Sequence, residues 1–372
     1  MLKWARENGC PWFDWTFTQG AVAGDLALLK WAKENGCPSN KEVTTEAAEH
    51  GHLEVLKWLK EEDHPWSDLA FSRAASAGHL EVLKWLKEVG CTPAFDPCAE
   101  AASGGHSEVL KWLREAGCLC KAGTCSSAVG TGRLEMLKWL REEGCPWDDW
   151  ACATAARGGH FEVLKWLRAN GCPWDSTTFD SAAHCGNMEM LRWLKEEGCP
   201  WDAKAFKAAA CRGNLEVLKW LKDEGCPSNE ETADNACSGA AHYGHIETLK
   251  WLRENGFPWS RFVPSIAIRA GNFELLQWAK GNGCPIGVHD ASAAAGIGRL
   301  DFLQWLKDNG APFNEDASHS AAGMNEKAAL IRLKENGFAW NEATCAGAAI
   351  GGHLELLKWL REQGCPWDWQ VL

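Results

Sequence analysis

Residues 51–61 read Gly-His-Leu-Glu-Val-Leu-Lys-Trp-Leu-Lys-Glu, and residues 78–88 repeat this stretch unchanged. Its tryptophan recurs along the chain at a fixed stride of twenty-seven positions, as from Trp58 to Trp85, with one longer step before Trp251 and one position at which arginine replaces it. We call these residues the stride tryptophans: Trp4, Trp31, Trp58, Trp85, Trp112, Trp139, Trp166, Trp193, Trp220, Trp251, Trp278, Trp305 and Trp359. A repeat of this length indicates one supersecondary unit stacked many times, because a single copy cannot bury its own apolar face.

The repeat unit has the pattern of two helices joined by tight turns. In the copy at residues 146–171, Asp148 suits the N-cap of a first helix of about ten residues. Gly159 then ends the first helix, and Gly171 ends the second. The two glycine columns have one exception each, Asn325 and Asp63. The pattern predicts helix, tight turn, helix and short loop in every copy.

Apolar columns predict where the repeats pack. The pair Ala47-Ala48 recurs in the first helix of most copies and would let the neighbouring helix approach closely. In the second helix around Trp166, apolar residues cover roughly 220° of the helical wheel, which is typical of a helix packed on three sides. We therefore expect the stride tryptophans to form core between repeats, with ligand stacking as the alternative.

The cysteines follow the repeat as well. Ten of the 18 share one column, in which other copies hold His64, Phe257, Ala311 and Phe338, so the column is predicted to be a buried apolar slot. Stacked helices lie about 10 Å apart, whereas a disulfide needs Cα atoms within about 7 Å. The column cannot cross-link itself, and we expect a reducing intracellular location, cytoplasmic with the nucleus left open.

Charge narrows the range of partners. The chain has 38 Lys and Arg residues against 50 Asp and Glu residues, a net charge of −12, which disfavours a nucleic-acid partner. No apolar run approaches the ~20 residues of a membrane span, and no signal peptide precedes the first copy. We expect a monomer without cofactor, membrane contact or nucleic acid.

Residues 47–61, with Ala47-Ala48 before the quoted stretch, resemble the Ala-Ala-x-x-Gly-His-x-Glu-Val-Val-Lys-x-Leu-Leu segment of the ankyrin repeat. The ankyrin unit has about 33 residues, and the residues missing here fall where that family carries its projecting β-hairpin. Only Cys-Pro-Trp remains there. The resemblance implies an all-α solenoid of about 13 ankyrin-like units with shortened loops. We expect residues 1–372 to form a single array that is truncated within a repeat at both ends.

A second row of tryptophans follows the Cys-Pro dipeptide in many copies, and we call these residues the loop tryptophans: Trp12, Trp66, Trp147, Trp174, Trp201, Trp259, Trp340 and Trp367. They replace the hairpin. Two interpretations are open, namely a lid over the core, which we prefer, and an exposed aromatic ladder for a partner.

Two groups of residues are candidate metal ligands. One column contains His52, His79, His106, His160, His245 and His353. Zinc needs bonds of about 2.0–2.1 Å, whereas stacking holds equivalent positions about 10 Å apart, so we predict helix capping for these histidines. The cluster Cys118, Cys120 and Cys125 is an alternative zinc site, although only Cys120 lies outside the buried columns. No phosphate loop, dinucleotide fingerprint, His-Glu-x-x-His motif or nucleophile elbow occurs.

The variable positions are −16, −12, −9 and −8, counted back from the stride tryptophan, and they share one face of the first helix. Constant columns build the stack, so these positions are predicted to face solvent. They form either a plain solvated face or, as the resemblance implies, a recognition surface along the concave side, with aromatic and arginine anchors. The predicted partner-binding residues are Trp15, Glu46, Arg73, Trp150, Arg157, His184, Lys204, Arg212, His242, Tyr243, Phe262 and Arg269.

Two copies depart from the pattern. The unit at residues 325–333 lacks its tryptophan, and Ile331 and Arg332 look exchanged relative to Lys-Trp, which predicts a local soft spot. Another copy gains four residues before Ala240, enough for one more helical turn near His242.

These features favour a non-catalytic scaffold that holds a protein partner along one face. A spacer or adaptor arm of a longer protein, with recognition located elsewhere, is the alternative. An enzyme is a third and least favoured hypothesis, because the sequence shows no nucleophile, base and metal ligands that would converge on one site.

Overall fold

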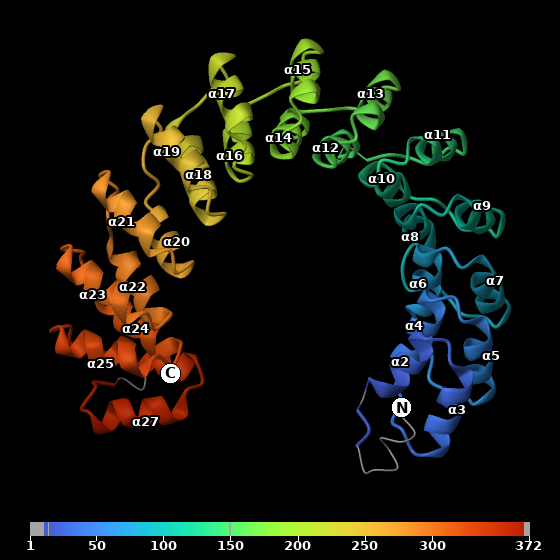
Figure 1. The fold of residues 1–372 in the computed structure, drawn as a ribbon, viewed down its shortest axis with the longest axis horizontal. Helices are drawn as coiled ribbons and strands as arrows, with labels where there is room; N and C mark the ends of the chain where they lie inside the picture. Colours follow the sequence, from blue (N-terminus) through green and yellow to red (C-terminus); the bar gives the residue numbers. More distant parts are fainter. Residues whose placement is uncertain (1–10, 14, 149, 368–372) are drawn as a thin grey trace. The chain divides into compact units, whose positions relative to one another are not determined.

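A computed structural model describes residues 11–13, 15–148 and 150–367 of the chain. In this part the chain forms twenty-six helices and no strand. Figure 1 shows helices joined by short loops. The predicted all-α fold of stacked helix pairs without hairpins is confirmed. Predictions for Trp4, Cys10 and residues 368–372 lie outside the described residues.

Each of thirteen repeats contributes a first and a second helix. The first helices have seven to thirteen residues: α2 (Thr16–Val22), α4 (Glu42–Glu49), α6 (Ala70–Ala77), α8 (Pro97–Gly104), α10 (Ala122–Gly130), α12 (Ala151–Arg157), α14 (Ser176–Cys185), α16 (Lys204–Ala210), α18 (Glu230–His242), α20 (Val263–Arg269), α22 (Val288–Gly296), α24 (Glu315–Gly323) and α26 (Glu342–Ile350). The second helices all have nine residues: α3 (Leu26–Glu34), α5 (Leu53–Glu61), α7 (Leu80–Glu88), α9 (Ser107–Glu115), α11 (Leu134–Glu142), α13 (Phe161–Ala169), α15 (Met188–Glu196), α17 (Leu215–Asp223), α19 (Ile246–Glu254), α21 (Phe273–Gly281), α23 (Leu300–Asp308), α25 (Lys327–Glu335) and α27 (Leu354–Glu362).

The helices belong to two compact units. Unit 1 comprises residues up to 182 together with 192–200, and unit 2 comprises 183–191 together with residues from 201 onward. Within each unit, successive first helices pack directly on one another and on their own second helices, as α4 does on α6 and α5. The alanine pair Ala47-Ala48 is completely buried at this junction, which confirms that small residues permit the close approach.

The predicted turns form with the expected conformations. Gly159 has φ of +73°, and the exceptions Asn325 and Asp63 have φ of +63° and +52°; they are the two non-glycine residues with positive φ in the described chain. The helix α12 begins at Ala151, slightly later than predicted. The Asp148 carboxylate accepts a hydrogen bond from the backbone N–H of Trp150 at 3.1 Å, so it initiates the turn into the helix rather than occupying the N-cap itself.

The stride tryptophans of the described chain are half-buried, and only Trp58 is nearly enclosed, at 7% exposure. They do lie between repeats, as predicted. For example, the ring centroids of Phe161 and Trp193 are 5.5 Å apart. The second helices pack less closely on one another than the first helices do, so these rings are closed on fewer sides than the leucines beside them.

Loop tryptophans cover this opening. Seven of them lie against the stride tryptophan 19 positions later, with ring centroids 5.4–6.2 Å apart, as in Trp147 against Trp166. Arg141 lies over the Trp147 ring, with its Cζ 3.9 Å from the centroid, and donates to the Cys145 carbonyl at 2.5 Å. These contacts support the lid interpretation, because the basic side chain closes the compact loop over the aromatic pair.

Both departures from the repeat are visible in unit 2. The four extra residues lengthen α18 to thirteen residues, as predicted. In α25, Ile331 takes the outward position at 40% exposure and Arg332 takes the half-buried position of the missing tryptophan. Phe313, in the loop-tryptophan column, stacks instead on Phe338, with centroids 4.4 Å apart.

Candidate functional site

The variable positions of the first helices face solvent. Of the twelve predicted partner-binding residues, ten are exposed, and Glu46 and His184 are half-buried. The aromatic members are conspicuous, because Trp15, Trp150 and Tyr243 each keep 61% of their surface exposed. The solvent-facing position of the predicted set is therefore confirmed, whereas its binding of a partner stays a prediction.

In unit 1 two charged members of this face, Arg73 and Glu46, have partners on the same face. Arg73 on α6 lies 3.7 Å from the carboxylate of Glu49 on α4, Nε to Oε2. Glu46 lies 3.8 Å from His50, one helical turn further on. These contacts leave the face of α4 and α6 polar, with Arg73 already beside a carboxylate.

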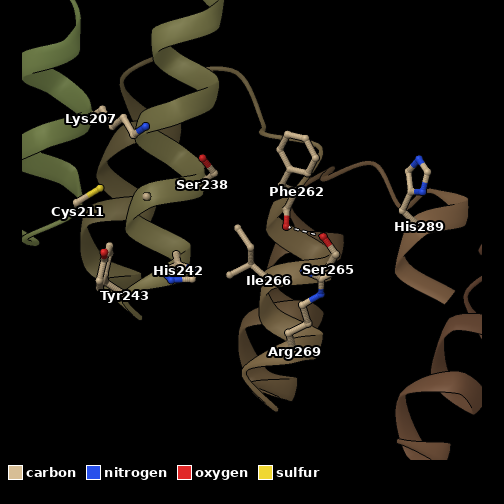
Figure 2. A pocket seen from close by; sticks show the side chains of 11 residues that line it. Lys207, Cys211, Ser238, His242, Tyr243, Phe262, Ser265, Ile266, Arg269 and His289 are labelled. Atoms are coloured by element: carbon tan, nitrogen blue, oxygen red, sulfur yellow. Dashed lines mark hydrogen bonds between the residues drawn. The ribbon is translucent and has the colours of Figure 1, made fainter. Parts of the chain in front are cut away.

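In unit 2 the same face is hollowed into a cavity of about 620 Å³ between α16, α18, α20 and α22, shown in Figure 2. Four predicted residues line it together: His242, Tyr243, Phe262 and Arg269. The other predicted residues of unit 2, His184, Lys204 and Arg212, lie outside this lining.

The C-terminal half of α18 forms one side of this cavity. His242 and Tyr243 stand at its C-terminal end, where both are exposed. On α20, Phe262, Ile266 and Arg269 share one helical face, at i, i+4 and i+7. Figure 2 shows the Ile266 side chain reaching into the space between α20 and α18.

A glycine allows α18 to approach α16 closely. A Cβ atom on Gly239 would lie 2.7 Å from the Sγ of Cys211, closer than real Cβ contacts permit. Both residues line the cavity. A side chain at position 239 would push the two helices apart or turn the Cys211 thiol, so glycine here fixes the floor of the cavity.

The electrostatics of the cavity contrast with those of the chain. Its lining contains Lys207, Arg269, His242 and His289 but no carboxylate. Neither Lys207 nor Arg269 forms an ion pair within the described residues. In a chain with a net charge of −12, this is a local concentration of positive charge without compensation.

One buried carboxylate lies beside the cavity without lining it. Asp290 on α22 is 2% exposed and accepts a hydrogen bond from the Gly287 backbone N–H at 2.7 Å, which caps the start of the helix. Burial raises the pKa of Asp290 to about 6. Near neutral pH the group is therefore costly to ionise, a cost that no lysine or arginine offsets.

Several lining residues were missed in the sequence, for two reasons. Ile266 stands at position −12 relative to Trp278 and His289 at position −16 relative to Trp305, and the variable-face pattern includes both positions. The pattern could have found them. Lys207 stands at position −13 relative to Trp220, next to a face position but outside the pattern.

The histidine column behaves differently from the prediction. His52 stands at the N-cap of α5, but its side chain accepts no hydrogen bond from that helix. Instead its Nε2 donates to the backbone carbonyl of Val22 in the preceding repeat at 2.9 Å, and four other histidines of this column make the same cross-repeat bond at 2.9–3.2 Å. Where the column holds asparagine, as at Asn272, the side chain does cap its own helix, accepting from the Leu275 N–H at 2.9 Å.

This difference follows from chemistry and reach. The carboxamide oxygen of asparagine is close enough to the backbone to accept from the N–H groups of the next turn. The longer imidazole ring extends to the preceding repeat, where the last carbonyls of the first helix lack partners. The histidines thus act as links between repeats.

The cysteines are free thiols throughout the described chain, and most of the predicted column is buried. Burial raises the pKa of Cys125, Cys199, Cys237 and Cys284 to about 12, so these thiols stay protonated and unreactive near neutral pH. Among the described residues no group of three or more His, Cys, Asp or Glu side chains is arranged to hold a metal ion. In the same part of the chain, every helix is too short or too polar to cross a bilayer.

The family model described as Ankyrin repeats (many copies) matches residues 45–87, 149–195 and 237–279. These three regions of the chain are similar to ankyrin repeats. The third matched ankyrin region runs from within α18 to α21 and therefore includes most of the cavity. The predicted family resemblance is confirmed, and the described loops between ankyrin units contain no β-hairpin.

Solved structures give fold-level likenesses. The ankyrin repeat domain of human ASB11 is 20% identical, with a TM-score of 0.31, over 56% of this chain and 96% of that one. The pentatricopeptide repeat protein PPR10 from maize is 13% identical, with a TM-score of 0.34, over 100% of this chain and 72% of that one. With TM-scores this low, neither likeness bears on the function of these ankyrin repeats. No curated protein sequence matches the chain.

Proposed function

We propose that this chain is a non-catalytic scaffold that binds a protein partner along the variable face of its first helices. Ankyrin repeats in general mediate protein–protein interaction. The observation that carries the proposal is the cavity of unit 2, where four of the variable residues converge around exposed aromatic rings. Aromatic and arginine side chains are the usual anchors of protein interfaces.

The buried chemistry of the repeats agrees with a scaffold. The thiols with pKa values near 12 are poor nucleophiles, and the histidines donate to backbone carbonyls rather than to a reacting group. We place the scaffold inside the cell, in the cytoplasm, because its free cysteines suit a reducing compartment.

A capture experiment tests the proposal. The purified full chain would be used as bait beside a face variant, Arg157→Ala, His184→Ala and Arg212→Ala combined. A matched control, Lys111→Ala, Lys219→Ala and Lys280→Ala, removes the same number of polar side chains from second helices. We expect at least one protein that the wild type and the control retain and the face variant loses, with all three baits equally folded by circular dichroism. Capture that is indifferent to the face variant would favour a spacer or adaptor arm instead.

A further inference from the structure

We propose that the cavity between α16, α18, α20 and α22 binds an acidic peptide segment of a partner protein, with an apolar side chain beside its carboxylates. This inference rests on the proposed scaffold function and specifies the chemistry of the partner. It goes beyond that function, because it assigns the contact to one place in unit 2.

Charge complementarity is the first support. Lys207 comes from α16 and Arg269 from α20, so the positive charges flank the cavity from two helices. His242 and His289 add two further nitrogen donors at its rim. Along the helices concerned, α18 carries Glu230, Glu231 and Asp234 in its first half, and Asp290 on α22 is buried. Of these acidic residues, Glu231, Asp234 and Asp290 do not line the cavity. A carboxylate-bearing ligand would provide the counter-charges that the chain itself omits.

Apolar surface is the second support. Phe262 remains 45% exposed and Tyr243 61% exposed, with Ile266 between them on the cavity floor. Arg261 lies over the outer face of Phe262, with Cζ 4.8 Å from the centroid. An apolar side chain seated against these groups would remove their surface from water, which is worth about 25 cal/mol per Å² buried.

A second cavity also holds cations, but together with carboxylates. In unit 1 a cavity of about 410 Å³ is lined by Lys111 and Arg114, but also by Glu115 and Glu143. Arg114 lies 3.6 Å from the Glu143 carboxylate and also donates to its backbone carbonyl at 3.3 Å. Arg114 is therefore already neutralised within the chain, and the lining holds two carboxylates, unlike the lining that holds Lys207 and Arg269.

The peptide is favoured over a nucleic acid by the surrounding charge. A polyphosphate strand would extend beyond the cavity onto a chain that is acidic overall, and its binding would be opposed there. A short acidic segment places its charges only where the cations are.

The test selects peptides without presupposing the partner. A random peptide library displayed on phage would be selected on the immobilised full chain, and the enriched peptides would be synthesised and measured by fluorescence anisotropy. We expect peptides that combine carboxylates with an aromatic or aliphatic residue. The double variant Lys207→Glu/Arg269→Glu should weaken their binding at least about tenfold, or ~1.4 kcal/mol. Lys219→Glu/Lys280→Glu, the same charge change on exposed second-helix positions, should leave binding within about twofold.

Each other outcome overturns the inference. Enrichment of neutral or basic peptides, no enrichment, or acidic peptides indifferent to the cavity variant would each refute it. Peptides lost with Arg157→Glu but not with Lys207→Glu/Arg269→Glu would keep the scaffold function and reject this site. Peptides indifferent to every change on the first-helix face would reject both. If a single-stranded oligoribonucleotide competes with the peptides and its binding needs Lys207 and Arg269, the cavity is assigned to nucleic acid. If the chain self-associates in sedimentation analysis and the cavity variant does not, the cavity is assigned to a second copy of the chain.

Discussion

The two units use the same repeat but present different surfaces. In unit 1, Arg73 and Arg114 lie beside carboxylates of the neighbouring repeat, so these two cations are neutralised within the chain. In unit 2, Lys207 and Arg269 line a cavity without such partners. Both departures from the repeat, the long α18 and the altered α25, also fall in unit 2.

The difference shows how an array of near-identical repeats can have one surface that differs from the others. Helix ends, alanine pairs and tryptophan contacts are common to both units, so they cannot distinguish one surface from another. In unit 2, Gly239 permits close contact between α18 and Cys211, so the face is hollowed there without any change in those columns. The lining of this cavity holds Lys207 and Arg269 but no carboxylate, so it is positively charged.

The largest expected effect concerns the buried carboxylate that only the cavity side carries. The pKa of Asp290 is raised by burial from 3.8 to about 6, so its protonated form stabilises the fold below about pH 4 and that stability is lost as the pH rises through 6. At pH 7 the cost reaches at most about 3 kcal/mol. Asp290→Asn keeps an acceptor for the Gly287 N–H, and we expect it to raise the urea midpoint at pH 7 more than at pH 4.

A matched change in unit 1 checks this explanation. Asp96 initiates α8 by accepting from the Cys98 N–H at 3.0 Å, and asparagine is an equally good residue at a helix start. Asp96→Asn should therefore bring no stabilisation at pH 7. If the two variants shift the midpoint alike at both pH values, burial of Asp290 is not the source of the difference between the units.

The next effect concerns α25, where unit 2 lacks a stride tryptophan. Phe313 stacks on Phe338 there, so the usual loop-to-stride pair over the second helix is missing. We expect the amides of α25 to exchange with deuterium at least about tenfold faster than those of α13, a difference of ~1.4 kcal/mol in local opening. The variant Ile331→Lys/Arg332→Trp restores the repeat pattern and should slow the exchange. Equal protection of α25 and α13 in the wild type would contradict the soft spot.

Much of the fold could be predicted from the sequence because residues that recur at one repeat position indicate the conformation or burial which that position requires. Two columns of glycine, one broken only by Asn325 and the other only by Asp63, identify the left-handed turns, and both exceptions adopt them. The extra turn of α18 followed from counting residues. The reach of the histidines did not follow, because the carbonyls that they bind lie in the preceding repeat, about thirty positions away.

The candidate site could be predicted only as a face. The pattern of variable positions supplied Phe262 and Arg269, but convergence of Lys207, His242 and His289 on one cavity depends on the spacing of three helices. That spacing is set by tertiary contacts such as Gly239 against Cys211, which no single column records. The absence of carboxylates becomes meaningful only once the lining is known.

The smallest expected effect separates charge from shape as the origin of the difference. Glu49→Gln in unit 1 removes the carboxylate beside Arg73, an exposed pair worth at most about 0.5 kcal/mol, so the urea midpoint should hardly change. Arg73 then becomes an uncompensated cation on a first-helix face without the cavity of unit 2. We expect the affinity for acidic peptides, measured by anisotropy with Lys207→Glu/Arg269→Glu in the background, to rise by no more than about twofold. A rise to the wild-type affinity would mean that a free cation on any first helix is enough to bind acidic peptides. It would contradict the proposal that the cavity is required.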